Sequence, residues 1–305
     1  MSTMIALVGE QPMPILLPAR SLKPQEAILV CTKGAIRGTE HVAKRLMKLI
    51  PQSSALIVSP YEFDSTFEKL QDITKDKSDL IFNLTGGTKM MALAAFGLAA
   101  SQPNSRFIYL QSEGHTSLLF SYRFEAGSPI FEKKERLETQ QGDAPLITIA
   151  DYLKAHLPGF RLEDFSADEG GDFEKRIYSA LKDEFEVLTG VRPEGVADQI
   201  EIDLVIRCGN QVAIAEIKLG DARGEGPKKG LDQLAMAGRR EYLGTYTTKF
   251  LITGRQLSQS SRKQIHTLAQ DANINIIEPS GKFWDNRRDT KRLVQTVKEK
   301  LCSAR

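Results

Sequence analysis

Residues 199–220, QIEIDLVIRCGNQVAIAEIKLG, constrain the fold of this 305-residue chain more than any other stretch. Two runs of alternating apolar and polar residues meet at a Cys-Gly-Asn turn, a pattern typical of a β-hairpin. Glu216 and Lys218 are two residues apart and point to one face of the second arm, and Asp203 on the first arm can lie opposite them. Buried charges on apolar strands are costly unless they are paired or bind a metal, so the hairpin is a candidate active site. The alternative is a Glu216–Lys218 salt bridge on the wet face of an edge strand.

The length and composition of the chain favour a soluble protein of two domains. Each half of 305 residues can bury its own core, and the net charge of +2 excludes a strongly basic tail. Cys31, Cys208 and Cys302 lie far apart, which argues against a disulfide framework and structural zinc and favours a reducing cytoplasm. The start, MSTMIALVGE, lacks the basic residues of a signal peptide, and no apolar run is long enough for a membrane span, so we expect no membrane partner.

The N-terminal half alternates short apolar runs with helical patterns. The runs are too continuous in apolar residues for a sheet with one wet face, so they predict a mostly parallel, doubly wound, Rossmann-like α/β sheet. The expected strands are 5–8, 27–31, 55–58, 80–84 and 107–110, the expected helices are 35–50, 65–74 and 88–100, and 117–124 adds a hairpin strand.

Two loops at the carboxyl ends of these strands are the places to expect a ligand. The first is GEQPMP at residues 9–14, and the second is NLTGGTKM at residues 83–90. In the second loop two glycines allow close backbone approach, two threonines offer hydroxyls, and Lys89 opens a helix whose free amides attract anions, so a phosphate-bearing ligand suits it. The alternative is that Thr88 simply caps an apolar helix. Neither a triphosphate-binding loop nor a dinucleotide fingerprint is present, so a dinucleotide cofactor is not expected.

The stretch from MIALVGEQPMPILLPARSLKPQEAILVCT to NLTGGTKMMALAA resembles the CARF domain, a Rossmann-like sensor of cyclic oligoadenylates, in the form found in the Card and Can CRISPR ancillary nucleases. The resemblance covers residues 1–140. It implies a homodimer that holds one cyclic tetra-adenylate across its axis. The matching contacts are Gln11, Thr85, Gly86, Gly87, Thr88 and Lys89. Paired helix N-termini and a symmetric pair of lysines suit a ring of four phosphates.

A charged and polar stretch, EKKERLETQQGDAP, follows Phe131 and marks the domain boundary. We expect a linker over residues 141–168 that contains a short helix at 149–157. The C-terminal domain then spans residues 169–305.

The C-terminal domain has the element order of a restriction-endonuclease-like α/β core. A helix is expected over 172–188, followed by the hairpin, a helix at 230–242, a strand at 250–253, a helix at 258–269, a strand at 274–277 and a helix at 290–301. This order and the hairpin residues resemble the PD-(D/E)xK nuclease superfamily. The residues that match its motif are Glu174, Asp203, Glu216 and Lys218. Ile202-Asp203 stands where the family has Pro-Asp.

The resemblance implies a metal-dependent nuclease. Asp203, Glu216 and the backbone carbonyl of Ile217 would bind Mg²⁺ or Mn²⁺ through hard oxygen ligands, with Glu174 completing the shell. Lys218 would orient the attacking water and stabilise the transition state. Gln233 matches an accessory polar position of some relatives, with a plain surface residue as the alternative.

Charge distribution favours a nucleic-acid substrate. Residues 151–217 carry 7 basic and 15 acidic residues, and residues 218–305 carry 18 and 9. The basic residues that can meet a phosphate backbone are Arg239, Arg240, Arg262, Lys263, Arg287, Arg288, Lys291 and Arg292. Together with the two family resemblances, this implies a cyclic-oligoadenylate-activated nuclease of DNA or RNA in type III CRISPR defence. Two alternatives stay open: a regulator that binds nucleic acid without cutting it, and a ring nuclease that degrades the cyclic oligoadenylate.

Overall fold

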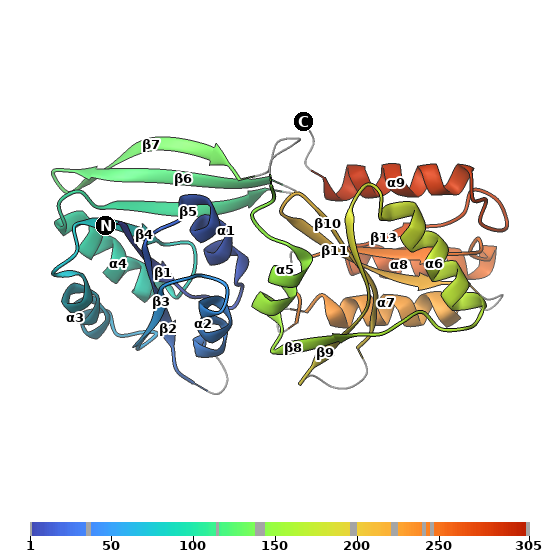
Figure 1. Ribbon diagram of the computed structural model, residues 1–305, viewed down its shortest axis with the longest axis horizontal. Coiled ribbons are helices and arrows are strands. Elements are labelled where there is room, and N and C mark those ends of the chain that lie inside the picture. The colour runs from blue at the N-terminus through green and yellow to red at the C-terminus, as the bar shows by residue number, and fades with distance from the viewer. Residues whose placement is uncertain are drawn as a thin grey trace. The chain divides into compact units, whose positions relative to one another are not determined.

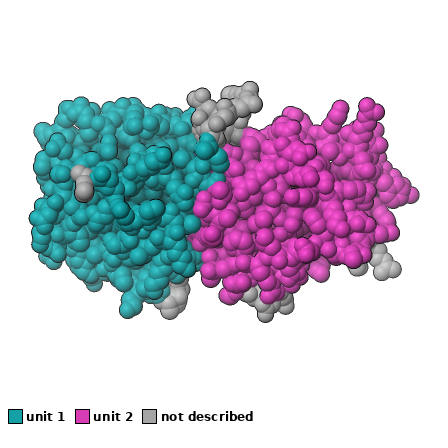
Figure 2. Space-filling view, viewed as in Figure 1, with its two compact units in different colours: residues 1–147 teal, residues 148–305 magenta. Residues whose placement is uncertain are grey.

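The computed structural model describes residues 2–34, 38–113, 116–137, 144–195, 200–220, 225–239, 242–244 and 247–302. The chain divides into two compact units, residues 1–147 and 148–305 (Figure 2). Gln199 and Arg240, which the sequence singled out, lie outside the described residues. No helix in the described ranges is both long and apolar enough to cross a membrane.

Unit 1 is built on a seven-stranded sheet in the order β3-β2-β1-β4-β5-β6-β7 (Figure 1). The first five strands pair in parallel, and β6 and β7 extend the sheet as antiparallel strands. The elements are β1 (Ser2–Leu7), α1 (Met13–Leu22), β2 (Glu26–Thr32), α2 (Glu40–Met47), β3 (Ser53–Val58), α3 (Phe63–Thr74), β4 (Asp79–Asn83), α4 (Lys89–Ser101), β5 (Arg106–Glu113), β6 (Thr116–Glu125) and β7 (Ser128–Arg136).

The core of unit 1 confirms the predicted parallel sheet. Ile5, Leu7 and Phe82 on central strands pack against Leu70 of α3 and Met91 of α4. Figure 1 shows α1 and α2 on the other side of this sheet. Both faces of the central strands are therefore covered, as continuous apolar runs require. β3 differs, because it is an edge strand and most of its residues are exposed or half-buried.

Two elements of unit 1 were not predicted. Helix α1 begins inside the expected loop 9–14, with Pro14 in its first turn. Proline is compatible with a first helical turn because that N–H has no intrahelical partner in any case. Strand β7 arises from a polar, largely exposed sequence that lacks the alternation of a half-buried strand.

Unit 2 is built on a six-stranded mixed sheet in the order β13-β12-β11-β10-β9-β8. The strands from β8 to β11 pair antiparallel, and β11, β12 and β13 pair in parallel. The elements are α5 (Ile149–His156), β8 (Gly159–Leu162), α6 (Glu169–Leu181), β9 (Glu186–Glu194), β10 (Ile202–Cys208), β11 (Gln211–Lys218), α7 (Glu225–Ala237), β12 (Thr248–Thr253), α8 (Gln259–Asp271), β13 (Ile274–Ile277) and α9 (Arg288–Leu301). Residues 148–168, assigned from sequence to a linker, thus belong to unit 2 and provide α5 and β8.

The alternation along the hairpin strands separates an apolar face from a polar one. Leu204 of β10 and Ala215 of β11 are register partners, and both belong to the core formed with α6 and α9. Side chains alternate along a strand, so Asp203 and Glu216 point to the other face, on which α7 packs against β11. The predicted hairpin is confirmed, and its register places these two carboxylates side by side.

The helix expected over residues 172–188 is wrong at its C-terminal end. Helix α6 ends at Leu181, and β9 begins at Glu186. Leu181 and Phe185 are four residues apart and both buried, so they mimic one helical stripe. The chain turns between them, however, and Phe185 reaches the core from outside the helix.

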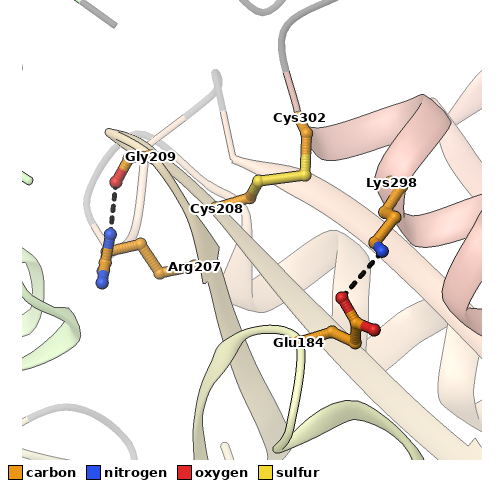
Figure 3. The surroundings of a disulfide bond; sticks show 6 residues. All are labelled: Glu184, Arg207, Cys208, Gly209, Lys298 and Cys302. Carbon is orange, nitrogen blue, oxygen red and sulfur yellow. Dashed lines mark hydrogen bonds and ion pairs between the residues drawn. A yellow bond between two sulfur atoms is a disulfide. The ribbon is translucent and has the colours of Figure 1, made fainter. Parts of the chain in front are cut away.

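The expectation that no disulfide forms is also wrong. Cys208 and Cys302 are joined by a disulfide with a Cα–Cα distance of 5.4 Å across 94 residues (Figure 3). It links the end of β10 to the residue that follows α9. Nearby, Lys298 of α9 lies 2.7 Å from the Glu184 carboxylate. The third cysteine, Cys31, is free and buried in β2.

Candidate functional sites

Three charged side chains converge at the carboxyl end of β11 and the adjacent start of β10. Nζ of Lys218 lies 2.8 Å from Oε2 of Glu216 and 3.5 Å from Oδ2 of Asp203. The same Asp203 oxygen accepts a hydrogen bond of 2.6 Å from the backbone N–H of Ile217. The structure thus brings together the three residues that the sequence placed on one face.

The salt bridge between Glu216 and Lys218 that the alternative predicts does form, but it does not lie on the wet face of an edge strand. β11 lies between β10 and β12, so it is a central strand rather than an edge strand. Glu216 is 1% exposed and Asp203 is 9% exposed. A salt bridge at this depth is costly to desolvate and adds little net stability, so its presence asks for a functional reason.

Electrostatics at this cluster disfavour negative charge. Burial raises the pKa of Glu216 well above its usual range, the Asp203 carboxylate raises it further, and Lys218 only partly opposes them. Burial also raises the pKa of Asp203, against the opposing effects of Lys218 and the Ile217 N–H. Burial lowers the pKa of Lys218, but the two carboxylates outweigh it and the net pKa is raised. A cation close to these two carboxylates favours their charged form, which burial and mutual repulsion disfavour.

A cavity of about 600 Å³ opens onto the cluster and contains the two remaining predicted residues. Glu174 of α6 and Gln233 of α7 line it together with Asp203 and Lys218. Burial raises the pKa of Glu174 to about 7, and the charge of Asp203 adds to the effect. A perturbed carboxyl in a cavity is typical of a functional site.

The donor set fits a hard divalent cation. Asp203 and Glu216 offer carboxylate oxygens, and Oε1 of Gln233 is buried without a hydrogen-bond partner. An orphaned buried acceptor is costly and is relieved by a donor such as a metal-bound water. No group of three His, Cys, Asp or Glu residues in the described part of the chain is placed to hold a metal. Glu174 therefore lines the same cavity without joining Asp203 and Glu216 in one three-carboxylate set.

In unit 1, the two predicted loops meet at the carboxyl ends of neighbouring strands. β1 and β4 pair in parallel, and the connection order reverses between them, which is where open α/β sheets bind ligands. A Cβ built on Gly86 would lie 2.1 Å from the carbonyl oxygen of Leu7 and 3.0 Å from N of Gly9. Gly87 adopts φ of 75°, a conformation that favours glycine. The glycines therefore allow the two loops to touch.

The hydroxyls of this loop already have structural partners. Thr85 donates to Oδ1 of Asn83 at 2.7 Å and accepts from the N–H of Leu110 at 2.8 Å. Thr88 is the N-cap of α4, where its side chain accepts from the N–H of Met91. The capping role considered as an alternative for Thr88 is thus observed.

Two more predicted residues lie at these loops, one exposed and one half-buried. Lys89 is the first residue of α4 and is exposed, so its ammonium can add to the positive end of the helix. Gln11 is half-buried in the turn between β1 and α1. The loops and the α4 N-terminus together form a surface suited to an anion.

Sequence reasoning missed Asn83 at the end of β4. Asn83 is fully buried, and its amide donates to the carbonyl oxygen of Pro14 at 2.9 Å. That carbonyl lies four residues before Pro18, which has no N–H to donate to it. Asn83 therefore ties α1 to the second loop, and an Asn inside the apolar run IFNL was the available signal.

Among the basic residues proposed for nucleic-acid contact, the structure assigns some to intramolecular pairs. Arg262 lies 2.9 Å from the buried carboxylate of Glu278, and Arg292 lies 3.9 Å from Asp289. Arg287 and Lys291 are exposed on or beside α9. Arg262 and Arg292 are thus already paired within the chain, so fewer of these basic side chains remain for nucleic-acid contact than the sequence suggests.

Comparison with known proteins agrees with the architecture. Residues 3–152 match the family model of the Card1 CARF domain. Can2 from Sulfobacillus thermosulfidooxidans in complex with cyclic tetra-adenylate is similar over 98% of this chain and 99% of that chain, with 17% sequence identity and a TM-score of 0.71. Protein VC1899 from Vibrio cholerae is similar over 98% of this chain and 97% of that chain, with 13% identity and a TM-score of 0.69. No curated protein matches the chain.

These matches establish the fold of both units. The family model covers the predicted N-terminal sensor region and confirms its resemblance to a CARF domain. The two solved structures confirm the α/β class, with a mostly parallel sheet followed by a second α/β unit. At such low identity they carry no information on the chemistry of the hairpin cluster.

Proposed function

We propose that the protein is a metal-dependent nuclease that is switched on by a cyclic oligoadenylate in type III CRISPR defence. The observation that carries the proposal is the buried cluster of Asp203, Glu216 and Lys218, of which Asp203 and Lys218 line the cavity of unit 2. The match of residues 3–152 to the Card1 CARF domain supports the regulatory ligand. The Can2 structure, which contains cyclic tetra-adenylate, favours the ring of four adenylates.

The chemistry follows from charge. A Mg²⁺ or Mn²⁺ ion held by Asp203, Glu216 and the Ile217 carbonyl would activate water and offset negative charge on the scissile phosphate. Lys218 then orients the attacking water and stabilises charge on the phosphate through its ammonium. Glu174 and Gln233, which line the same cavity, would help to position water. The substrate is the phosphodiester backbone of DNA or RNA.

The regulatory ligand would bind at the loops of unit 1. Gln11, Lys89 and the N-terminal amides of α4 serve one half of the ring, while Gly86 and Gly87 allow its phosphates close approach. Thr85 and Thr88 shape the loop: each donates its one hydroxyl proton within the chain, Thr85 to Asn83 and Thr88 to the Pro60 carbonyl, so each offers only its remaining acceptor capacity. A homodimer would supply a second, symmetric set of contacts.

Cleavage of labelled RNA, single-stranded DNA and plasmid with Mn²⁺, with and without cyclic tetra-adenylate, tests the proposal. We expect the ligand to increase cleavage and Glu216→Gln to reduce it about 100-fold or more while ring affinity stays unchanged. Lys89→Ala should weaken ring binding and raise the ligand concentration needed for activation. Binding without cleavage of any substrate would favour the regulator, and conversion of the ring to a linear product would favour a ring nuclease.

A further inference from the structure

A second pocket of unit 2, separate from the cavity of the charged cluster, has the side chains of a nucleobase site. Its volume is about 320 Å³, and it lies between α6, the ends of β11 and β12, and the segment before α9. Leu219, which lines it, directly follows Lys218, and Phe173, which also lines it, directly precedes Glu174. The pocket is therefore next to the proposed catalytic cluster along the chain. Phe173 and Leu219 pack with the core on the α6 and α9 face of the sheet, whereas the cluster lies on the other face.

An exposed aromatic ring stands at the rim of this pocket on a fixed backbone. Phe283 is 56% exposed, and its backbone forms an antiparallel bridge with Arg255. On the two sides of this residue, Lys282 accepts from the N–H of Gln256 at 3.1 Å, and Trp284 donates to the carbonyl of Gly254 at 3.0 Å. The ring of Phe283 is thus held outward by the backbone rather than left on a loose loop.

Two cations lie over the ring of Phe283, and two further aromatic side chains line the pocket. The guanidinium of Arg255 lies 5.6 Å from its ring centroid, and the ammonium of Lys282 lies 5.5 Å from it. Deeper in the pocket, Trp284 packs edge-on against Phe173 at 5.5 Å between centroids. Aromatic faces and guanidinium planes are the surfaces on which unpaired bases stack.

The acidic groups of the pocket suit an amino-bearing base. Glu169 and Asp172 of α6 line it, and their carboxylates repel phosphate oxygens. Carboxylates accept hydrogen bonds from exocyclic amino groups, such as N4 of cytosine or N6 of adenine. Arg176 and Arg255 keep the rim attractive to a nucleic-acid backbone.

We infer that this pocket is a substrate subsite that receives one unpaired, amino-bearing nucleobase, stacked on Phe283, from the strand that is cut. The inference rests on the proposed nuclease function and narrows its substrate to single-stranded nucleic acid, or to duplex with an unpaired base. Bases inside an intact duplex are stacked and paired and cannot enter without extrusion.

Two readouts on the full-length protein separate this inference from the nuclease proposal. The first is binding of fluorescent 20-nucleotide single strands of deoxycytidine or thymidine by the Glu216→Gln variant, which needs no cleavage. We expect Phe283→Ala to weaken binding of the deoxycytidine strand about fivefold or more, and Phe283→Tyr to restore it. Asp172→Asn together with Glu169→Gln should reduce the preference for deoxycytidine over thymidine.

The second readout is cleavage kinetics on single strands in which each position in turn is abasic. In the otherwise wild-type protein, one abasic position should raise KM about fivefold or more with kcat little changed, and Phe283→Ala should remove that sensitivity. Leu268→Ala, a matched exposed apolar residue on α8, is the control and should change neither readout. Unchanged strand affinity in Phe283→Ala, or equal sensitivity to the abasic position with and without Phe283, would overturn the subsite. Strand binding that depends on Phe283 without any cleavage would keep the subsite and reject the nuclease.

Discussion

The ammonium of Lys218 lies 2.8 Å from the Glu216 carboxylate, and both side chains leave the same face of a central strand. The pair is nearly dry, because Glu216 is 1% exposed. In this position Lys218 supplies positive charge beside both carboxylates. Each member should therefore matter to stability as well as to chemistry.

Lys218→Met should lower the stability of unit 2 by about 1–3 kcal/mol, because it leaves two buried carboxylates without their cation. Adding Glu216→Gln should restore part of this loss, since the most buried carboxylate is then gone. Thermal and denaturant unfolding of both single variants and the double variant measures the coupling. Strictly additive effects would show that the 2.8 Å contact between Lys218 and Glu216 contributes nothing to the stability of unit 2.

The disulfide should stabilise unit 2 independently of the catalytic cluster. It closes a segment of 94 residues, and cross-links of this length typically add about 2–4 kcal/mol by restricting the unfolded chain. We expect Cys302→Ser to lower the unfolding midpoint of unit 2, and a reductant to do the same to the wild type. The Cys208→Ser, Cys302→Ser double variant is the control, because a reductant should not change its stability further. An equal effect of reductant on the double variant would show that the reductant acts through something other than this disulfide.

How far the sequence predicts this fold depends on whether the deciding contacts are local. Ile274–Ile277, with the sequence INII, is a short isoleucine-rich segment with turn residues around it, and it is the predicted strand, residue for residue. The hairpin and its charged face followed from alternation alone. Local patterns fail where two structures share a spacing, as with Leu181 and Phe185, which fit a helix although the chain leaves the helix between them.

Long-range partners could not be predicted from pattern. Cys208 and Cys302 are 94 residues apart, and only the packing of α9 beside the hairpin brings them together. The exposed position of Phe283 at a pocket could not be predicted, because it depends on a backbone bridge to Arg255 from another segment. Glu174, by contrast, was predicted at the site from the sequence, and the structure places it in the lining of the same cavity as Asp203.

Gly86→Ala should destabilise unit 1 by about 2 kcal/mol or more and abolish ring binding. The added Cβ would lie 2.1 Å from the Leu7 carbonyl oxygen, and backbone of this kind cannot move aside without separating the two loops. Gly97→Ala is the matched control in the interior of α4, where the nearest atom, on Phe67, lies 3.8 Å away. That substitution should be neutral or stabilising by up to about 1 kcal/mol. Thermal unfolding and calorimetric titration with cyclic tetra-adenylate measure both effects, and a stable Gly86→Ala protein with intact ring affinity would contradict the close approach.

Asp289 should make unit 2 sensitive to acid. This fully buried carboxylate accepts from the N–H of Ser280 at 2.9 Å and from the N–H of Asp285 at 2.8 Å. Burial alone would raise the pKa of Asp289, but the hydrogen bonds from Ser280 and Asp285 outweigh it, so the pKa is lowered. A carboxyl with a lowered folded-state pKa stabilises the fold above its unfolded pKa of about 4, and this contribution is lost as the pH falls through the folded value.

Asp289→Asn should therefore lower stability by about 1–3 kcal/mol near neutral pH. The side-chain N–H₂ of asparagine would replace one carboxylate oxygen, so two hydrogen-bond donors would meet where a donor and an acceptor meet now. The cost should shrink as the pH falls below about 4, where the unfolded carboxyl becomes protonated first and the folded carboxyl follows at its lower pKa. Denaturant unfolding of both proteins across pH measures this difference. Asp271→Asn on the exposed end of α8 is the control and should show no such pH dependence. A cost for Asp289→Asn that stays constant into acid would mean that packing, and not the ionised carboxylate, holds the start of α9 against Ser280.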